Sequence, residues 1–387
     1  MNTIKALLVL EDGTVYEGSS FSIKGEVTAE IIFNTSLTGY QEVLTDPSYK
    51  GQMVVMTYPL IGNYGIIKAD DESSGIHLDA FIVKECSRRV SNWRADMSLP
   101  DYLKKNNIIG IEGIDTRALT RRIREHGAMK AIISTDPSTV GTRHAVSLLL
   151  EKVRASEGIV GKDLVKEVTC KKMYTWDEAR IETLDVRSKK KETEGKNSVV
   201  VIDCGVKYNI LRELVENNCS VMVVPARTSS TEILQLKPDG VLLSNGPGDP
   251  AAVPYVFNTV KELVGKVPLF GICLGHQMLG LALGAKTYKL KFGHHGGNQP
   301  VKDLKTGCIH ISVQNHGFCV DANTLQKDDF EVTHINLNDQ TLEGIEHKKF
   351  PAFSVQFHPE ASPGPNDAKY LFGKFKKMME NERRAKG

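Results

Sequence analysis

The sequence predicts an α/β protein in two parts: a strand-rich, mixed amino-terminal domain and, after it, a doubly wound, mainly parallel α/β domain. Three observations support this fold class. Short β-rich runs dominate about the first 130 residues, a charged stretch without apolar periodicity follows, and beyond it continuous apolar runs alternate with helical segments. Strands of a parallel sheet are apolar throughout because helices cover both faces of the sheet.

The amino-terminal domain is predicted over residues 1–187, with a core at about 1–135 and a connecting segment after it. Asp115 is placed to cap a helix over residues 115–126, and Gly127 is placed to end it. Short runs predict an opening hairpin and three further strands, at 6–21, 31–33, 53–57 and 80–83.

Residues 188–197 are predicted to be a charged linker, and residues 198–387 the second domain. The basic tail at 374–387 is predicted to be a solvated helix end. Continuous apolar runs predict strands at 198–202, 221–224, 240–243, 268–272 and 352–357. Helices are predicted between them, at 209–217, 254–264 and 278–283.

Composition excludes several classes of protein. The 387 residues include 49 Lys and Arg against 47 Asp and Glu, so the near-neutral chain is not expected to bind nucleic acid. The apolar run at 6–10 ends at Glu11, too early for a membrane span or a secretory leader. The seven cysteines form no Cys-x-x-Cys pair and are odd in number, which favours reduced thiols. We therefore expect a soluble, cytoplasmic protein.

Cys273 is the candidate nucleophile. It follows the apolar run at 268–272, precedes a predicted helix, and has Gly271 and Gly275 two residues to either side. This is the spacing of a nucleophile elbow, a sharp strand-to-helix turn that leaves little room for side chains at the flanking positions. The first N–H groups of the helix favour negative charge on a thiolate and on a nearby oxyanion.

A thiol near pH 7 needs a base, because its pKa of about 8.5 leaves only a small thiolate fraction. His358 ends the apolar run at 352–357, Pro359 stops that strand, and Glu360 is placed to orient the imidazole. His276 lies on the turn itself and is expected to pack locally. The sequence therefore predicts a Cys-His-Glu triad.

A rigid turn follows the strand predicted at 240–243. Gly246 and Gly248 stand among two prolines, so its backbone can approach a ligand closely. Its N–H groups, with that of Leu274, are candidates for stabilising the oxyanion of a tetrahedral intermediate.

The motifs at 246–248, 271–277 and 358–360 together resemble those of the triad, or class I, glutamine amidotransferases, from about Ser198 to the end of the chain. The resemblance implies hydrolysis of glutamine through a γ-glutamyl thioester and transfer of ammonia to a partner synthase. It assigns Cys273 as nucleophile, His358 as acid/base and Glu360 as its orienter. It also implies that Leu274 and Gly248 supply the oxyanion N–H groups.

The segments at 34–49, 57–65 and 113–117 resemble the amino-terminal domain of the small, glutamine-hydrolysing subunits of carbamoyl-phosphate synthetase. With 292–300 and 314–318, that likeness covers almost the whole chain. In that family a serine from the first domain, here Ser48, reaches the substrate in the second. The residues that the resemblance assigns to glutamine binding are Ser48, Gly246, Gly248, Leu274, Gln277, Asn315, Gly317 and Phe318.

The resemblance further implies a heterodimer, or a higher oligomer of heterodimers, with a large subunit that makes carbamoyl phosphate from ATP, bicarbonate and tunnelled ammonia. ATP and Mg²⁺ or Mn²⁺ are expected on that subunit, and no cofactor is expected in this chain, which contains neither a Gly-x-x-x-x-Gly-Lys-Ser/Thr loop nor a Gly-x-Gly-x-x-Gly motif. The carbamoyl phosphate is expected to serve arginine biosynthesis, pyrimidine biosynthesis or both.

Three alternatives compete with this interpretation. A different glutaminase, such as that of anthranilate synthase, would share residues 271–277 but leaves the first domain without a use. A non-catalytic scaffold is disfavoured by the joint presence of Cys273, His358 and Glu360. A metal site is also disfavoured, since no cysteine–histidine spacing supports zinc. The histidines considered for it are His294, His295, His310 and His316.

Overall fold

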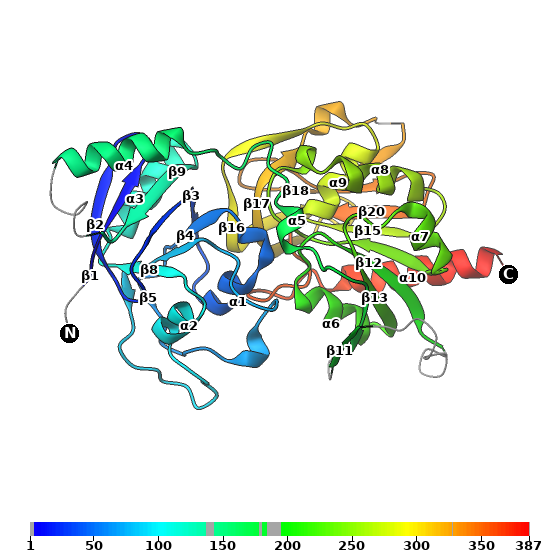
Figure 1. The fold of residues 1–387 in the computed structure, drawn as a ribbon. Coiled ribbons are helices and arrows are strands. Elements are labelled where there is room, and N and C mark those ends of the chain that lie inside the picture. The colour runs from blue at the N-terminus through cyan, green and yellow to red at the C-terminus, as the bar shows by residue number, and fades with distance from the viewer. Residues whose placement is uncertain (1–3, 137–142, 178–179, 184–194, 327, 387) are drawn as a thin grey trace. The chain divides into compact units, whose positions relative to one another are not determined.

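The computed structural model describes residues 4–136, 143–177, 180–183, 195–326 and 328–386 (Figure 1). The chain forms two compact units, residues 1–162 with 291–296, and residues 163–290 with 297–387. The sequence-based division groups 163–187 with the first domain. Most of the predicted linker lies outside the described residues, and that division stays a prediction.

A closed barrel forms the first unit, with neighbouring strands in the order β1-β2-β8-β6-β4-β3-β9. The predicted hairpin is confirmed as β1 and β2, which pair antiparallel, and the other predicted strands are confirmed as β3, β4 and β6. The sequence analysis did not identify β8 or β9, and β9 closes the barrel by pairing with both β1 and β3. The barrel strands are β1 (Ile4–Leu10), β2 (Val15–Ser20), β3 (Glu26–Asn34), β4 (Gln52–Met56), β6 (Ala80–Ile82), β8 (Ile109–Glu112) and β9 (Met129–Ser134).

The apolar run in β1 is continuous because both of its faces are buried. Leu8 and Leu10 belong to one core cluster of the barrel, whereas Leu7 and Val9 pack with Leu149 in another. Successive side chains of a strand point to opposite faces. Helix α4 (Arg143–Ala155), which carries Leu149, lies along β1 and β9 (Figure 1).

The predicted helix at 115–126 is confirmed as α3 (Thr116–His126). The Asp115 carboxylate accepts a hydrogen bond from the Ala118 N–H at 3.0 Å, and Gly127 follows with φ 101°. Two short helices, α1 and η1, lie in a polar stretch where the sequence analysis predicted none. The remaining elements of this unit are α1 (Tyr40–Thr45), η1 (Pro47–Tyr49), β5 (Leu60–Ile61), η2 (Lys68–Asp70), β7 (Glu85–Cys86) and α2 (Leu99–Lys105).

An 11-stranded sheet forms the second unit, in the order β11-β10-β13-β12-β14-β15-β20-β19-β18-β16-β17. Strands β13, β12, β14, β15 and β20 are parallel, as the apolar runs predict, and the strands from β19 to β16 extend the sheet antiparallel. The strands are β10 (Tyr174–Asp177), β11 (Arg180–Thr183), β12 (Asn197–Asp203), β13 (Cys219–Pro225), β14 (Gly240–Leu243), β15 (Leu269–Ile272), β16 (Thr287–Asp303), β17 (Ile309–Val320), β18 (Phe330–Asn336), β19 (Leu342–His347) and β20 (Ala352–Val355).

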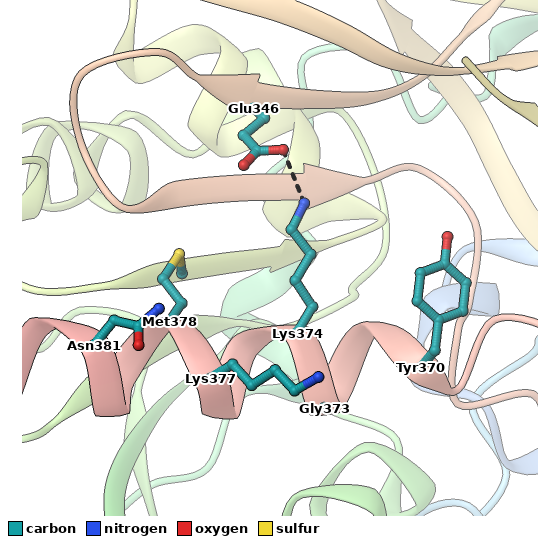
Figure 2. A pocket seen from close by; sticks show the side chains of 7 residues that line it. All are labelled: Glu346, Tyr370, Gly373, Lys374, Lys377, Met378 and Asn381. Atoms are coloured by element: carbon teal, nitrogen blue, oxygen red, sulfur yellow. Dashed lines mark hydrogen bonds and ion pairs between the residues drawn. The ribbon is translucent and has the colours of Figure 1, made fainter. Parts of the chain in front are cut away.

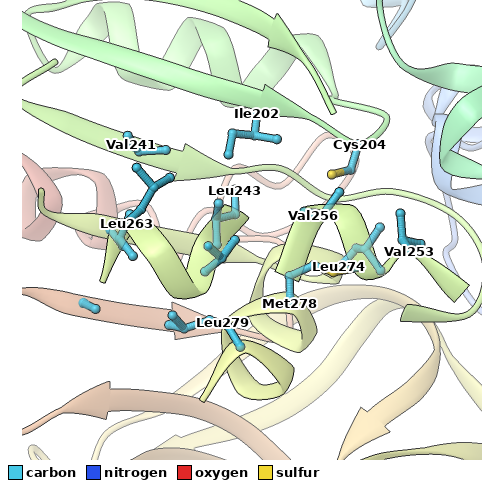
Figure 3. Packing of buried hydrophobic residues seen from close by; sticks show 14 of the residues in the cluster. Ile202, Cys204, Val241, Leu243, Val253, Val256, Leu263, Leu274, Met278 and Leu279 are labelled. Carbon is cyan, nitrogen blue, oxygen red and sulfur yellow. The ribbon is translucent and has the colours of Figure 1, made fainter. Parts of the chain in front are cut away.

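Both faces of the parallel strands are covered. In β12, Val200 and Ile202 pack in one core cluster, whereas Val199 and Val201 pack in the other. Figure 3 shows the first cluster, where Leu243 lies among apolar side chains from α8 and α9. The helices are α5 (Val165–Val168), α6 (Tyr208–Glu216), α7 (Ser230–Gln235), η3 (Pro250–Ala252), α8 (Pro254–Leu263), α9 (Leu274–Ala282), η4 (Ala322–Thr324) and α10 (Tyr370–Lys386).

Helix α10 differs from the solvated end predicted for the tail. Phe375 and Met379 are buried in the second core cluster, because one face of the helix packs against the sheet. Among the described residues, no helix is both long enough and apolar enough to cross a membrane.

Candidate active site

A sharp strand-to-helix turn carries Cys273. Strand β15 ends at Ile272 and helix α9 begins at Leu274, four residues before the predicted helix start at 278. The Cys273 backbone lies at φ 54° and ψ −103°, where non-glycine residues are rarely found. Strain of this kind clusters at functional sites, where the surrounding packing maintains it.

Close packing requires the two glycines that flank the turn. A Cβ on Gly271 would lie 2.6 Å from the carbonyl oxygen of Gly275, and one on Gly275 would lie 2.2 Å from that of Leu243. No side chain fits at those separations, so the spacing noted in the sequence has a direct steric cause.

The thiol of Cys273 is buried at the start of helix α9. The residue is 2% exposed, and its Sγ donates a hydrogen bond to the Asn315 carbonyl oxygen at 3.6 Å. The Cys273 carbonyl accepts the N–H groups of His276 and Gln277, which begins the helical hydrogen-bond pattern. The amides at a helix start carry partial positive charge, which favours a thiolate or an oxyanion there.

His358 and Glu360 form a buried pair just beyond β20. Nδ1 of His358 lies 2.7 Å from Oε1 of Glu360, and both side chains are almost fully excluded from solvent. Strand β20 ends at Val355, and an isolated antiparallel bridge to Val313 then holds the His358 backbone. Nε2 of His358 is also buried and makes no hydrogen bond to a described residue. Of the two ring nitrogens, only Nδ1 is engaged by Glu360.

Neighbouring charges affect the pKa values of His358 and Glu360 more than burial does. Burial alone would lower the pKa of His358, but the negative charges of Glu360 and Cys273 raise that pKa to about 10. Burial would raise the pKa of Glu360, but the positive charges of Lys207 and His358 lower it to about 2. Neighbouring charges, more than burial, thus set the pKa values of both members of the pair.

Lys207 is a site residue that the sequence analysis did not identify. Its side chain is 2% exposed, and Nζ lies 3.0 Å from Oε1 of Glu360 and 2.6 Å from the Ala361 carbonyl oxygen. The Lys207 N–H also donates to Oδ1 of Asn245 at 3.1 Å. One sequence signal could have found it, since Lys207 follows an apolar strand of a parallel sheet, where ligands bind.

The turn after β14 lies against the Cys273 turn. A Cβ on Gly246 would lie 2.1 Å from the Cys204 carbonyl oxygen and 2.8 Å from Cδ2 of Leu274, and Gly248 has φ 87°. Only glycine suits either position. The structure thereby brings together the two backbone segments that the sequence analysis selected as oxyanion donors.

Four further predicted residues surround the turn. Asn315, Gly317 and Phe318 lie on β17, and the side-chain amide of Gln277 donates to the Phe318 carbonyl oxygen at 2.8 Å and to Gln356 at 3.0 Å. The first bond joins helix α9 to β17, and the second joins it to the segment just after β20. The glutamine-binding role of the four residues stays a prediction.

His276 packs locally, as predicted. It is fully buried, and its Nδ1 lies 2.9 Å from Oγ of Ser354. Burial, with the nearby positive charge of His334, lowers the pKa of His276 to about 3. His276 is therefore a neutral imidazole whose packing supports helix α9.

Ser48 lies in the first unit, in η1, and is 7% exposed. Its backbone N–H donates to Oδ1 of Asp46 at 2.9 Å, which caps the short helix. That Ser48 contacts the substrate stays a prediction.

The histidines considered for a metal divide between the two units. His294 and His295 belong to the first, and His310 and His316 to the second. In the second unit, Nδ1 of His316 bonds the Phe318 carbonyl oxygen at 2.8 Å and Nε2 bonds Gln314 at 3.0 Å. Both ring nitrogens of His316 thus support β17.

A pocket lies along helix α10 (Figure 2), and none of the predicted site residues lines it. Lys374 pairs with Glu346 at 2.8 Å, and its ammonium lies 4.3 Å from the centre of the Phe353 ring. Because these two charges pair with each other, the pocket is a weaker candidate for an active site than the Cys273 turn. Its lining residues are Glu346, Tyr370, Gly373, Lys374, Lys377, Met378 and Asn381.

Comparisons with known proteins match both parts of the chain. The family model described as "Glutamine amidotransferase class-I" matches residues 200–378. The model described as "Carbamoyl-phosphate synthase small chain, CPSase domain" matches residues 8–133. The two matches cover the resemblances noted in the sequence.

Curated relatives match over nearly the full length. A carbamoyl phosphate synthase small chain of Syntrophotalea carbinolica is 54% identical, over 99% of this chain and 100% of its own. Those of Nitratidesulfovibrio vulgaris and Solidesulfovibrio magneticus are each 52% identical, over 97% and 98% of this chain and 98% and 99% of their own.

Proposed function

This chain belongs to the family of carbamoyl phosphate synthase small chains, and from that premise we propose that it hydrolyses glutamine and supplies the ammonia to a large partner chain. The family excludes a glutaminase of anthranilate synthase, because the match extends through residues 8–133 and the full-length identity reaches 54%. The observation that carries the activity is the buried His358–Glu360 pair, whose imidazole is close enough to Cys273 for that residue to raise its pKa, beside the strained Cys273 turn.

In the first half-reaction, His358 accepts the Cys273 proton and Sγ attacks the side-chain carbonyl carbon of glutamine. The carbonyl electron pair moves to oxygen, and the N–H groups of Leu274 and Gly248 stabilise this oxyanion. When the tetrahedral intermediate collapses, the C–N bond breaks and the leaving nitrogen takes the proton from His358. Ammonia departs, and a γ-glutamyl thioester remains on Cys273.

In the second half-reaction, His358 takes a proton from water, and the hydroxide attacks the thioester carbonyl. The C–S bond then breaks, glutamate leaves, and the sulfur recovers its proton from His358. The same imidazole thus serves each half-reaction as base and then as acid. Its pKa, raised by Glu360 and Cys273, suits it to hold the proton between these steps.

Glu360 and Lys207 act through His358. The carboxylate fixes Nδ1 of the imidazole, so Nε2 is the nitrogen that transfers protons. The Lys207 ammonium keeps that carboxylate ionised in a site where burial alone would favour its neutral form. Gln277, Asn315, Gly317 and Phe318 then hold the α-amino and α-carboxylate groups of glutamine.

Ammonia leaves toward the large chain through an internal tunnel, because free ammonia in water would be protonated and lost. The large chain uses it with bicarbonate and ATP, and holds the Mg²⁺ or Mn²⁺ that ATP chemistry requires. Since ammonia released without a partner is wasted, glutamine hydrolysis is slow until the large chain docks.

The test is glutamine hydrolysis by the purified chain, with and without the co-expressed large chain. Wild type should release glutamate, and the large chain should raise the rate. Cys273→Ser should be inactive in both forms, since loss of the nucleophile costs about 10⁶-fold in comparable enzymes. A folded Cys273→Ser protein, checked by thermal unfolding, is the matched control. Equal inactivity of the two proteins in complex would leave only the scaffold interpretation.

A further inference from the structure

The segment Asp163–Cys170, here called the strap, lies across the carboxyl edge of the parallel strands in the second unit. At the end of β12, the Cys170 N–H donates to Oδ2 of Asp203 at 2.7 Å. Beyond β13, the Ala226 N–H donates to Oγ1 of Thr169 at 2.9 Å. Between these bonds and Asp163 lies the single turn of α5, visible in Figure 1. The strap therefore crosses the same sheet edge from which the active-site turns project.

Asp163, the first residue of the strap, is held by Tyr255 and Arg227, and these three side chains are here called the latch. The Tyr255 hydroxyl lies 3.1 Å and 3.2 Å from the two carboxylate oxygens of Asp163. Arg227 lies 3.4 Å from Oδ2 of Asp163, and its guanidinium stacks 3.9 Å from the centre of the Tyr255 ring. Because β13 precedes Arg227 and α8 carries Tyr255, the latch ties the strap to two separate elements of the scaffold.

Directly after the latch, Leu164 packs on the proposed oxyanion donor. A Cβ on Gly248 would lie 3.3 Å from Cβ of Leu164, and Leu164 is only 6% exposed. Gly248 itself lies at φ 87°, which glycine adopts without strain, so contacts with its neighbours, and not its own backbone preference, hold the peptide in one orientation. The next residue, Val165, is fully buried in the first core cluster of the second unit. This burial anchors the strap to the core.

We propose that the strap sets the orientation of the Gly248 peptide as an oxyanion donor, and that Asp163 is a positioning residue acting through Tyr255 and Arg227. The proposal rests on the glutaminase function proposed above. An oxyanion donor contributes only when its N–H points at the developing charge, so a small rotation of the Gly248 peptide weakens the transition state more than the bound substrate. The signature of the latch is therefore a change in kcat with little change in KM.

The experiment measures kcat and KM for glutamine with the large chain co-expressed. Tyr255→Phe removes the hydroxyl but keeps the ring beneath Arg227, and Asp163→Ala removes the carboxylate. We expect kcat to fall about fivefold and about thirtyfold respectively, with KM within about twofold of wild type, because small misplacements of catalytic groups cost up to about a hundredfold. Lys166→Ala, an exposed change on the same strap, is the matched control and should behave as wild type.

Three further measurements separate positioning from structural damage. Alkylation of Cys273 by iodoacetamide should proceed at the wild-type rate in Tyr255→Phe, since that reaction generates no oxyanion. The double variant should lose no more than Asp163→Ala alone, because both changes open the same latch. Asp163→Asn, which keeps a hydrogen-bond acceptor, should restore part of the kcat lost in Asp163→Ala.

The outcomes distinguish this proposal from the proposed function. An active wild type with latch variants that match Lys166→Ala overturns the latch alone. A rise in KM at constant kcat, or alkylation slowed in parallel with kcat, overturns it as well. An inactive wild-type complex removes the glutaminase function and, with it, the role proposed for the strap.

Discussion

The two large sheets of this protein differ at their edges, since one closes into a barrel and the other stays open. In the first unit, β9 pairs with both β1 and β3, so the barrel strands hydrogen-bond in a ring. In the second unit the sheet stays open, and its parallel strands β12, β14, β15 and β20 end on one edge. The turns that follow these strands carry Lys207, Gly248, Cys273 and His358. The parallel strands of the open sheet gather these side chains at their carboxyl ends. The barrel mixes parallel pairs, from β3 through β4 and β6 to β8, with antiparallel ones, so only some of its strands end on the same side.

The buried polar side chains of the two units also differ. In the first unit, Gln41 is fully buried and neutral, and its side-chain amide bonds the Ile67 N–H and carbonyl oxygen at 2.8 Å and 2.7 Å. In the second unit, Lys207, Glu360 and His358 are buried with charges, which burial disfavours. The neutral Gln41 side chain supports the fold. In the charged set, Lys207 lowers the pKa of Glu360, and Glu360 raises the pKa of the His358 imidazole.

The largest expected effect tests that charged set. Glu360→Gln keeps the shape of the side chain but removes its charge, so the imidazole loses both its orientation and its electrostatic support. We expect kcat for glutamine to fall about 10³- to 10⁴-fold in the complex, as for a triad carboxylate replaced by its amide. Gln41→Met, in the first unit, is the contrasting change and should lower stability by about 1–3 kcal/mol without changing the kcat of the folded fraction. Similar kcat values for Glu360→Gln and wild type would show that the buried charges, like Gln41, only support the fold.

The second effect compares one substitution at two glycines. Gly275→Ala forces a Cβ to 2.2 Å from a backbone oxygen, and we expect at least about 3 kcal/mol of lost stability from the backbone shifts required. Gly113→Ala, in the first unit, meets nothing nearer than 4.0 Å and carries only the strain of φ 82°, about 1–2 kcal/mol. Chemical denaturation of both variants gives the comparison. Equal losses would mean that backbone conformation, and not the close approach, governs the Cys273 turn.

A smaller effect is expected from Lys207→Met, which removes the cation but keeps an apolar chain of similar length. Glu360 then retains only His358 as a neighbouring positive charge, so we expect kcat to fall about thirtyfold, or about 2 kcal/mol in the barrier. Exposed Lys171→Met serves as the control. Comparison of the pH–rate profiles supplies the test: a profile identical to wild type would show that Lys207 has no electrostatic role in catalysis.

The smallest effect is a pH dependence of stability. The folded-state pKa of Glu360 lies below its unfolded value, so its contribution is present above about pH 4.5 and is lost as the pH falls toward 2. The pKa of His358 is raised, so its contribution is complete below about pH 6.5 and is lost as the pH rises toward 10. The Tm advantage of wild type over Glu360→Gln should therefore be greatest between these limits and shrink by a few degrees on either side. A constant difference across pH 3–9 would contradict the charge assignment.

Local patterns in the sequence predicted much of the fold and the residues at the centre of the candidate site. The spacing of Gly271, Cys273 and Gly275 predicted a turn that close packing explains, and continuous apolar runs predicted the parallel strands. Asp115 and Gly127 predicted the limits of α3, because a cap is a contact between near neighbours along the chain. His358 and Glu360 are two residues apart, so their pairing was also within reach of a local argument.

Contacts between distant residues were decided only by the tertiary structure. Lys207 meets Glu360 across 153 positions of sequence, and Asp163 meets Tyr255 across 92. Neither pair leaves a periodic trace, because a side chain shows its partner only once the strands that carry both have aligned. The closure of the barrel by β9 has the same origin, since a strand's neighbours depend on the whole sheet. The sequence by itself determined the segments that bear Cys273 and His358 and predicted their roles as nucleophile and base, whereas folding decided which buried charges surround them.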